Sequence, residues 1–315
     1  MKKITLIVIS VLLFGFFVSC NNNKNKSQQE ENTMRSGFIK IAVDQTMQPT
    51  MQAEVDMFET ENAATIEALY VSESEAIDLL MKDSVRLAVT ARRFTEAELG
   101  YFHLKTFEPE EIRIAIDGVA LIIHPENPDS IISVKDVRRI LTGEVTRWDE
   151  IFPNSKLGKI QVVFDNTNSS IVRYANDSIC REKPLSSDLN ALEKNEEVVN
   201  YISENKSAMG LIGVNLISDT YGSSAMDFTK KIQVMRVSRN DNATRANAVQ
   251  PYQYYIYNHQ YPFIREIFIL LNDPRGELPK GFTRFVTSDV GQRIILRSGL
   301  LPSTMPINAV TKNNY

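Results

Sequence analysis

The chain has 315 residues, of which 43% are hydrophobic, 23% charged and 9% aromatic. These proportions are those of a folded protein and exclude a disordered or collagen-like chain, and the length predicts about two domains. With 35 basic and 39 acidic side chains the formal net charge is −4, which argues against a nucleic-acid-binding protein, because such proteins are usually basic. Two cysteines cannot form a disulfide framework.

The N-terminus has the pattern of an export signal. Two lysines follow Met1, and residues 4–18 are an almost unbroken apolar run that is too short to cross a membrane comfortably. The run ends at Val18-Ser19-Cys20, which resembles the lipobox of bacterial lipoproteins, where the signal is cleaved before the cysteine and the cysteine is lipidated. We therefore expect a signal peptide over 1–19 and a lipid on Cys20 that anchors the chain to a bacterial membrane of the cell envelope. An N-terminal anchor helix with an incidental cysteine is the alternative.

A flexible tether is predicted over 20–36, because residues 21–29 (NNNKNKSQQ) are polar and have no apolar period. The folded part is predicted to start at Gly37. Cys180 is then its only thiol, and we expect this side chain to be buried as a small hydrophobic group. A reactive cysteine is the alternative, although no histidine lies near it in the sequence.

Beyond Gly37, predicted strands and helices alternate along the chain. Short apolar runs predict strands over 38–43, 64–70, 85–89, 119–123, 160–164 and 209–213. Helical spacing and capping residues predict helices after Pro49, over 76–80, after Ser133, from Val172, and over 189–203, 263–271, 280–287 and 290–297. This alternation predicts an α/β fold with a largely parallel sheet and helices on both faces, in which ligands bind at the carboxyl ends of the strands.

Several stretches resemble the phosphate-binding proteins of phosphate ABC transporters, the PstS-like proteins. Residues 119–128 (VALIIHPENP) and 137–148 (VRRILTGEVTRW) are similar to the family's VALVVNPENP and LRDIFTGKITNW. Residues 208–213 (AMGLIG), 261–262, 285–292 and 299–302 resemble further family motifs, so that the resemblance covers nearly everything from 38 to 305.

The resemblance implies a two-lobed periplasmic-binding fold, type II-like, with a ligand cleft between the lobes. Each lobe would be a mixed, mostly parallel sheet that is flanked by helices. Two crossings of the chain join the lobes in this family, so the first lobe is discontinuous. We place lobe 1 at 37–117 and 252–315, and lobe 2 at 118–251.

The resemblance also implies where the ligand binds. In the family an oxyanion is held by backbone N–H groups and hydroxyls at helix N-termini, which attract anions, and by one arginine. Four loops of this chain correspond, at 44–49, 72–74, 90–92 and 165–171. On them, or one helical turn beyond, lie the candidate ligand-binding residues Thr46, Met47, Ser72, Ser74, Thr90, Arg92, Asn168, Ser169, Ser170 and Arg173.

Two positions depart from the family pattern. Asp165 stands where the family has its arginine, and Ile171 where it has a threonine. Two unit charges about 4 Å apart at an effective dielectric constant of about 20 interact by roughly 4 kcal/mol. Repulsion in place of attraction would therefore weaken phosphate binding by roughly three or more orders of magnitude. Arg92 and Arg173 are the candidates for the missing cation, whereas Asp165 either accepts a proton-bearing group or is a turn residue.

These observations predict an extracytoplasmic solute-binding protein, not an enzyme, that takes phosphate or a similar oxyanion to the permease of an ABC transporter. The alternatives are the same fold with another ligand, such as a cation-bearing metabolite drawn to Asp165, a sensor, or a surface-assembly lipoprotein. No cofactor or metal is expected, because the three histidines lack metal-ligand spacing and neither GxSxG nor GxGxxG occurs. We expect a monomer that is anchored to the membrane through Cys20 and binds no nucleic acid.

Overall fold

The computed structural model describes residues 32–219 and 227–304. Cys20, the predicted signal peptide and most of the predicted tether lie outside the described residues. From Asn32 onward the chain forms one compact unit. None of the helices that the structure describes is long and apolar enough to cross a membrane.

The first elements alternate between strand and helix. They are β1 (Ser36–Asp44), the 3-10 turn η1 (Gln45–Met47), α2 (Gln48–Glu61), β2 (Ala63–Val71), α3 (Glu73–Met81), β3 (Leu87–Thr90) and α4 (Glu96–Leu104). Pro49 lies in the first turn of α2, where a missing N–H costs no hydrogen bond. Ser72 caps α3 by accepting from the Glu75 N–H. Helix α4 is absent from the elements predicted from the sequence; Thr95 and Glu98 form a capping box at its start.

The second half of the chain is richer in short elements. Its first members are β4 (Glu110–Ile123), β5 (Ile131–Ser133), α5 (Val134–Leu141), η2 (Trp148–Glu150), β6 (Gln161–Phe164), α6 (Ser170–Tyr174), the π-helical η3 (Ala175–Cys180), β7 (Asn190–Ala191), α7 (Asn195–Glu204), β8 (Ala208–Gly213) and η4 (Val214–Leu216). Then follow β9 (Ser218–Asp219), β10 (Asp227–Phe228), β11 (Gln233–Val234), β12 (Arg236–Ser238), β13 (Ala248–Val249), α8 (Gln253–Tyr257), β14 (Ile264–Leu271), α9 (Leu278–Val286), α10 (Asp289–Arg297) and β15 (Leu301–Pro302). The helix predicted over 189–203 begins only at Asn195.

One predicted helix is wrong. Residues 263–271 contain strand β14, which lies antiparallel between β3 and β4. Its apolar residues 267–271 are buried without a break, because a central strand is covered on both faces. Periodicity alone does not distinguish such a run from a buried helix. Strand β14 is important for the site, because it carries Arg265.

Ten of the described strands form one mixed sheet. Eight of them follow the order β2-β1-β3-β14-β4-β8-β6-β7, and β11 and β15 also pair with β4. Neighbouring strands are parallel at both ends of the sheet. In the centre, β14 is antiparallel to β3 and β4, and β4 is antiparallel to β8. The fold is thus the predicted mixed α/β type, with antiparallel pairing where the two longest central strands meet.

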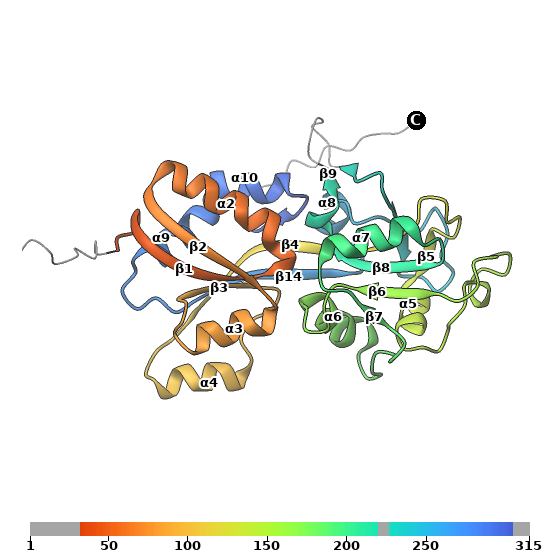
Figure 1. Cartoon of the computed structure of the whole chain (residues 1–315), viewed down its shortest axis with the longest axis horizontal. Coiled ribbons are helices and arrows are strands. Elements are labelled where there is room, and N and C mark those ends of the chain that lie inside the picture. Colours follow the sequence, from red (N-terminus) through yellow and green to blue (C-terminus); the bar gives the residue numbers. More distant parts are fainter. Residues whose placement is uncertain (1–31, 220–226, 305–315) are drawn as a thin grey trace, which may run out of the picture. The chain divides into compact units, whose positions relative to one another are not determined.

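Helices cover both faces of this sheet at each of its ends (Figure 1). At one end α2, α9 and α10 pack on one face around Phe58 and Phe282, and α3 and α4 pack on the other face around Phe102. At the opposite end α5 and α6 share a core with Trp148, and α7 packs on the other face through Val198. We call these two groups of cores lobe 1 and lobe 2; β4 and β14 contribute to both. The boundaries between lobes stay a prediction.

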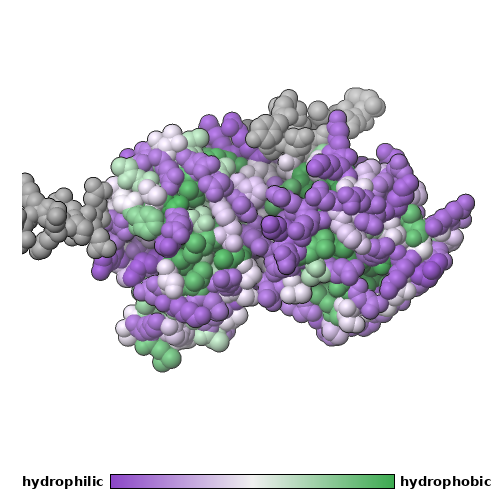
Figure 2. All heavy atoms as spheres, in the orientation of Figure 1, coloured by the Kyte–Doolittle hydropathy of each residue, from purple (hydrophilic) through white to green (hydrophobic). Residues whose placement is uncertain are grey.

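The core of lobe 2 contains Trp148 and Cys180, and the burial of Cys180 confirms the expectation from the sequence. Trp148 is fully buried, and its indole N–H donates to the Ser207 carbonyl at 2.9 Å. Cys180 is a buried free cysteine, and burial raises the pKa of its thiol to about 11. A thiol with a raised pKa is a poor nucleophile, which agrees with a packing role. Figure 2 shows one face of the molecule, on which most residues of both lobes are hydrophilic.

Candidate functional site

Polar loops from the two lobes meet at the middle of the sheet. The hydroxyls of Thr46 in lobe 1 and Ser170 in lobe 2 lie 3.3 Å apart. Asn215, which follows β8 in lobe 2, donates from its side chain to the Thr46 carbonyl at 2.8 Å. These contacts join segments that are more than 120 positions apart in the sequence. The predicted first and fourth ligand loops therefore lie side by side.

Short-range hydrogen bonds shape both loops. The Asp44 carboxylate accepts from the Thr46 N–H at 3.0 Å at the end of β1. Ser169 caps α6, because its hydroxyl accepts from the Val172 N–H at 3.2 Å. Such side-chain caps fix where the strand stops and the helix starts, and so they bring the Thr46 and Ser170 hydroxyls to the contact between lobes.

Arg265 on β14 is the cation at the centre of this site. Its side chain is 2% exposed. Its Nε donates to Asp117 Oδ2 at 2.9 Å, its Nη1 to Ser170 Oγ at 2.6 Å and its Nη2 to Thr46 Oγ1 at 3.1 Å. Asp117, on β4, also accepts from the Val214 N–H at 3.1 Å. The Arg265 guanidinium thus contacts residues of both lobes, and it joins β14 to β4, the two strands that contribute to both lobes.

Arg265 is missing from the residues predicted from the sequence. The apolar run around Arg265 predicts a helix, and the family pattern points to the 165–171 loop for the cation. A usable signal is present, however: an arginine stands inside a strongly apolar run. Arginine is almost never fully buried unless it is paired, so a strand assignment would have marked it for a buried ionic site.

Gly213 leaves room for this buried ion pair. A Cβ at this position would lie 2.8 Å from Asn215 Oδ1, 2.9 Å from Asp117 Oδ2 and 3.2 Å from Arg265 Nη2. Contacts under 3.0 Å force neighbouring atoms to move, and these neighbours are held by hydrogen bonds. The position therefore requires glycine for reasons of space.

Two more carboxyl groups are buried beside Arg265. Asp44 and Asp165 are 0% and 1% exposed, and each has one carboxylate oxygen, Oδ2, without a hydrogen-bond partner in the described structure. Burial raises the pKa of Asp165 to about 7, although the Ser169 hydroxyl, which donates to it, acts in the opposite direction. Burial also raises the pKa of Asp44, against the attraction of Arg265. Asp165 can therefore hold a proton near neutral pH and donate a hydrogen bond.

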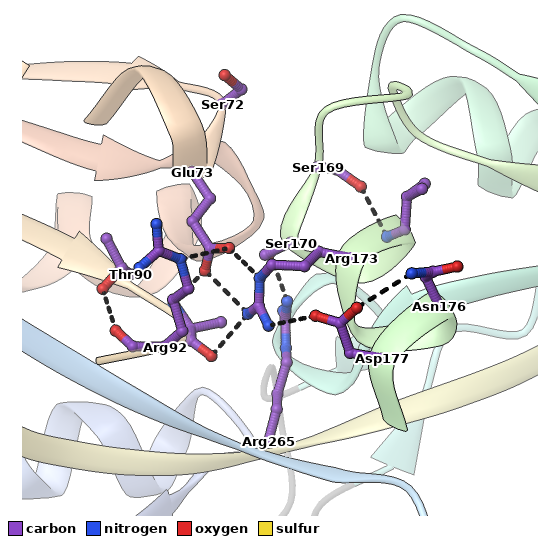
Figure 3. Close-up of polar contacts among 12 residues, drawn as sticks. Ser72, Glu73, Thr90, Arg92, Ser169, Ser170, Arg173, Asn176, Asp177 and Arg265 are labelled. Carbon is purple, nitrogen blue, oxygen red and sulfur yellow. Dashed lines mark hydrogen bonds and ion pairs between the residues drawn. The ribbon is translucent and has the colours of Figure 1, made fainter. Parts of the chain in front are cut away.

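A second set of charged groups lies beside the first (Figure 3). Glu73, the first residue of α3, accepts from Arg173 of α6 and from the Ala91 N–H at 2.8 Å. Arg173 also donates to the Ala91 carbonyl at 2.9 Å. Arg92 makes two 2.7 Å hydrogen bonds to Glu98 within lobe 1. Both arginines that were candidates for the missing cation are thus already paired with carboxylates.

A pocket of about 360 Å³ opens beside the Glu73–Arg173 pair. It is lined by Glu73, Ser74, Thr167, Asn168, Ser169, Val172, Arg173, Asn176 and Leu185. Four of the predicted ligand-binding residues are in this lining, and Thr46 and Ser170 join Arg265 deeper in the protein. Glu73 and Asn168 in this lining come from the loops that the sequence singled out, and Arg173 and Asn176 follow the fourth loop on α6 and η3.

The other four predicted ligand-binding residues have partners within the protein. Met47 packs in the core of lobe 1, Ser72 caps α3, the Thr90 hydroxyl donates to the Arg92 carbonyl at 2.8 Å, and Arg92 is paired as described. Ile171, which replaces the family's threonine, is buried in the core of lobe 2. Ligand contact by the ten predicted residues stays a prediction. In the described part of the chain, no cluster of His, Cys, Asp and Glu could hold a metal ion.

A polar site between two lobes that share crossing strands is the arrangement expected of a binding protein with the periplasmic-binding fold. The chain belongs to the PBP superfamily, because the model of a PBP superfamily domain matches residues 25–290. The resemblance to phosphate ABC transporter substrate-binding proteins, inferred from the motifs, is confirmed by individual relatives.

Among curated relatives, the phosphate-binding protein PstS of Pseudomonas aeruginosa strain PAO1 is 21% identical over 73% of this chain and 71% of its own length. PstS of Borreliella burgdorferi is 21% identical over 96% of this chain and 99% of its own length. Among solved structures, a protein from Clostridium perfringens, assigned as a phosphate ABC transporter substrate-binding protein and holding phosphate, superposes with a TM-score of 0.70 at 20% identity and covers 85% of this chain and 100% of its own. The ABC-type phosphate transport receptor of Vibrio cholerae superposes with a TM-score of 0.65 at 19% identity, with coverage of 85% and 100%. The predicted fold is thereby confirmed.

Proposed function

We propose that this chain is an extracytoplasmic solute-binding protein that takes a small oxyanion, phosphate first, and delivers it to the permease of an ABC transporter. The observation that carries the proposal is the Arg265 guanidinium, which is buried within hydrogen-bond distance of hydroxyls from both lobes. A ligand that accepts from this group and from Thr46 and Ser170 would bridge the lobes. The phosphate-binding relatives support the choice of ligand.

The acids around Arg265 favour an oxyanion that carries its own protons. Asp44 and Asp165 each present a buried carboxylate oxygen that has no partner in the described structure. Phosphate near neutral pH bears at least one proton that it can donate to such an oxygen, whereas sulfate bears none. A carboxylic acid with a raised pKa can in turn donate to a phosphate oxygen. We therefore infer that the site prefers phosphate to sulfate.

The excess of acidic groups supports a second candidate ligand. Asp44, Asp117 and Asp165 are all buried near the single Arg265 side chain. If the acids are ionised in the bound state, the site is net negative and a solute with an ammonium group is preferred. This second candidate keeps the fold and the location of the site and changes only the class of solute.

The N-terminal pattern supports a lipid anchor. We propose that Cys20 is lipidated, that the chain functions as a monomer at a membrane of the cell envelope, and that the polar residues after Cys20 separate the anchor from the folded part. Tethering to a membrane would keep the binding protein near the permease, because a tether raises the effective concentration of the linked partner.

Isothermal titration calorimetry of the purified full chain tests the ligand. Phosphate, sulfate and ethanolamine are titrated separately at equal ionic strength. Saturable heat with phosphate alone supports the first candidate, and saturable heat with ethanolamine alone supports the second. Equal responses to phosphate and sulfate would contradict the role given to Asp44 and Asp165, and no response to any of the three would contradict both candidates.

A further inference from the structure

The Glu73 carboxylate lies among donors from both lobes (Figure 3). Its Oε1 accepts from the Ala91 N–H at 2.8 Å and from Arg173 Nη2 at 3.2 Å, and its Oε2 accepts from Arg173 Nε. Arg92 Nε lies 4.0 Å from the same oxygen. The Glu73 side chain is only 3% exposed. Two guanidinium groups and one backbone N–H therefore surround a single buried carboxylate.

These donors are of the kind that binds an external oxyanion. Guanidinium groups form charge-assisted, often bidentate hydrogen bonds with carboxylate and phosphate alike. Arg173 and Glu73 both line the pocket of about 360 Å³, so an anion that entered the pocket would meet the guanidinium if Glu73 were absent. The donors thus form an anion subsite whose occupant in this structure is a side chain of the protein.

The same contact joins the lobes. Glu73 and Ala91 belong to lobe 1, and Arg173 projects from α6 of lobe 2 and donates to both of them. Arg92 is held by Glu98 within lobe 1 and contacts Glu73 only at 4.0 Å. The Glu73–Arg173 pair, together with the hydrogen bond from Arg173 to the Ala91 carbonyl, therefore holds the lobes together at this side of the site, as a bound anion would otherwise do.

We propose that Glu73 acts as an intramolecular ligand: its carboxylate occupies an anion subsite formed by Arg173 and the Ala91 N–H, and it holds the two lobes together when no solute is bound. A solute with a carboxylate or phosphate group enters this subsite only by displacing Glu73. The inference does not depend on phosphate being the solute at Arg265, because it concerns a separate set of donors.

Hydrogen–deuterium exchange of the full chain, read by mass spectrometry over residues 87–94 and 169–177 in the absence of solute, tests this proposal. In Glu73→Gln these segments exchange at least about tenfold faster than in the wild type, since the lost pair is a charge-assisted one. Glu98→Gln is the matched control: it breaks the similar Arg92 pair, but inside lobe 1, and it leaves exchange over 169–177 unchanged. Wild-type exchange over 169–177 in Glu73→Gln overturns the proposal.

Chemical rescue separates an anion subsite from a merely structural contact. Glu73→Ala leaves the donors without their carboxylate, and millimolar acetate slows exchange of both segments back toward the wild-type rate. Acetate leaves the wild type unchanged, because the subsite is filled, and sodium chloride at the same ionic strength does not rescue the variant. Faster exchange in Glu73→Ala that acetate does not reverse shows a structural role only and overturns the proposal. Both readouts stand whether or not phosphate binds at Arg265.

Discussion

Arg265 and Asp117 are direct cross-strand partners in the centre of the sheet. Their Cα atoms are paired in the antiparallel register of β14 and β4, and Arg265 Nη2 lies 2.9 Å from Asp117 Oδ2 with both side chains almost fully buried. The register of two strands therefore places the guanidinium before any ligand arrives. A cation held in this way loses little conformational freedom when it binds an anion.

Removal of Arg265 tests the importance of this pair. Arg265→Gln leaves the Asp117 charge buried without its partner, so we expect the free energy of unfolding to fall by about 3–5 kcal/mol. We also expect loss of the phosphate response. Urea unfolding measures the first effect and calorimetry the second.

The strands offer a matched control. Arg113 and Glu266 also form an ion pair between β4 and β14, but both side chains are more than 40% exposed, and Arg113→Gln should cost no more than about 1 kcal/mol. The double variant Arg265→Gln with Asp117→Asn should recover part of the lost stability, because no unpaired buried charge remains. Equal effects of Arg265→Gln and Arg113→Gln would contradict the central role of the buried pair.

Gly213→Ala tests the space beside the ion pair. The new methyl group would meet three polar atoms at 2.8–3.2 Å, so we expect destabilisation by about 1–3 kcal/mol and weaker phosphate binding through displacement of Asp117 and Arg265. Gly100→Ala is the comparison, because Gly100 lies in α4 where no other atom of the described residues comes within 4 Å of the added carbon, and the change should be neutral or slightly stabilising. Unchanged stability and binding in Gly213→Ala would show that the pair tolerates the shift.

The pKa of Asp165 predicts how stability depends on pH. The pKa is raised from 3.8 to about 7 in the folded chain, so between these values the folded state holds a proton that the unfolded state has lost. The contribution of protonated Asp165 to the free energy of unfolding is thus greatest below about pH 4 and is lost as the pH rises toward 7. We expect the wild type to lose more stability over this range than Asp165→Asn, by up to about 1.4 kcal/mol per pH unit. Parallel urea-unfolding profiles of the two proteins between pH 4 and pH 7 would refute this assignment.

Glu54 is buried without a hydrogen-bond partner among the described residues and should be dispensable for folding. It is 0% exposed in the middle of α2, both of its carboxyl oxygens lack a hydrogen-bond partner in the described part of the chain, and burial raises its pKa to about 9. Glu54→Leu removes this desolvated group, so we expect a gain in unfolding free energy of about 1–3 kcal/mol. Glu61→Leu at the exposed end of the same helix should change stability by less than about 0.5 kcal/mol. A less stable Glu54→Leu protein would indicate a partner or a role for this acid.

The lipid anchor is tested by Cys20→Ala. If the lipobox is used, the wild-type chain partitions into the detergent phase of a cell extract and Cys20→Ala does not, because a diacyl anchor holds a protein on the membrane far more strongly than a polar N-terminus does. Cys180→Ala keeps the anchor and serves as the control. Equal partition of wild type and Cys20→Ala would favour an uncleaved anchor helix instead.

The sequence by itself determined the class of fold and many of the longer elements. Apolar runs, caps and prolines are local signals, so they identified β1, α2, β2, α3, α5, β6, β8 and the two last helices, and the motifs identified the family. The family motifs also selected the loops that meet at the site, in which Thr46 and Ser169 are held by hydrogen bonds with near neighbours.

Only the tertiary structure decided which charges belong together. Arg265 contacts Thr46, Asp117 and Ser170, which are 219, 148 and 95 positions away, and Arg173 meets Glu73 across 100 positions. No local pattern encodes such pairings, because they arise from the order and register of strands in the sheet. Arg265 lies in an apolar run that is equally consistent with a helix and a strand. Its place in the site therefore follows only from the pairing of β14 with β3 and β4 in the sheet.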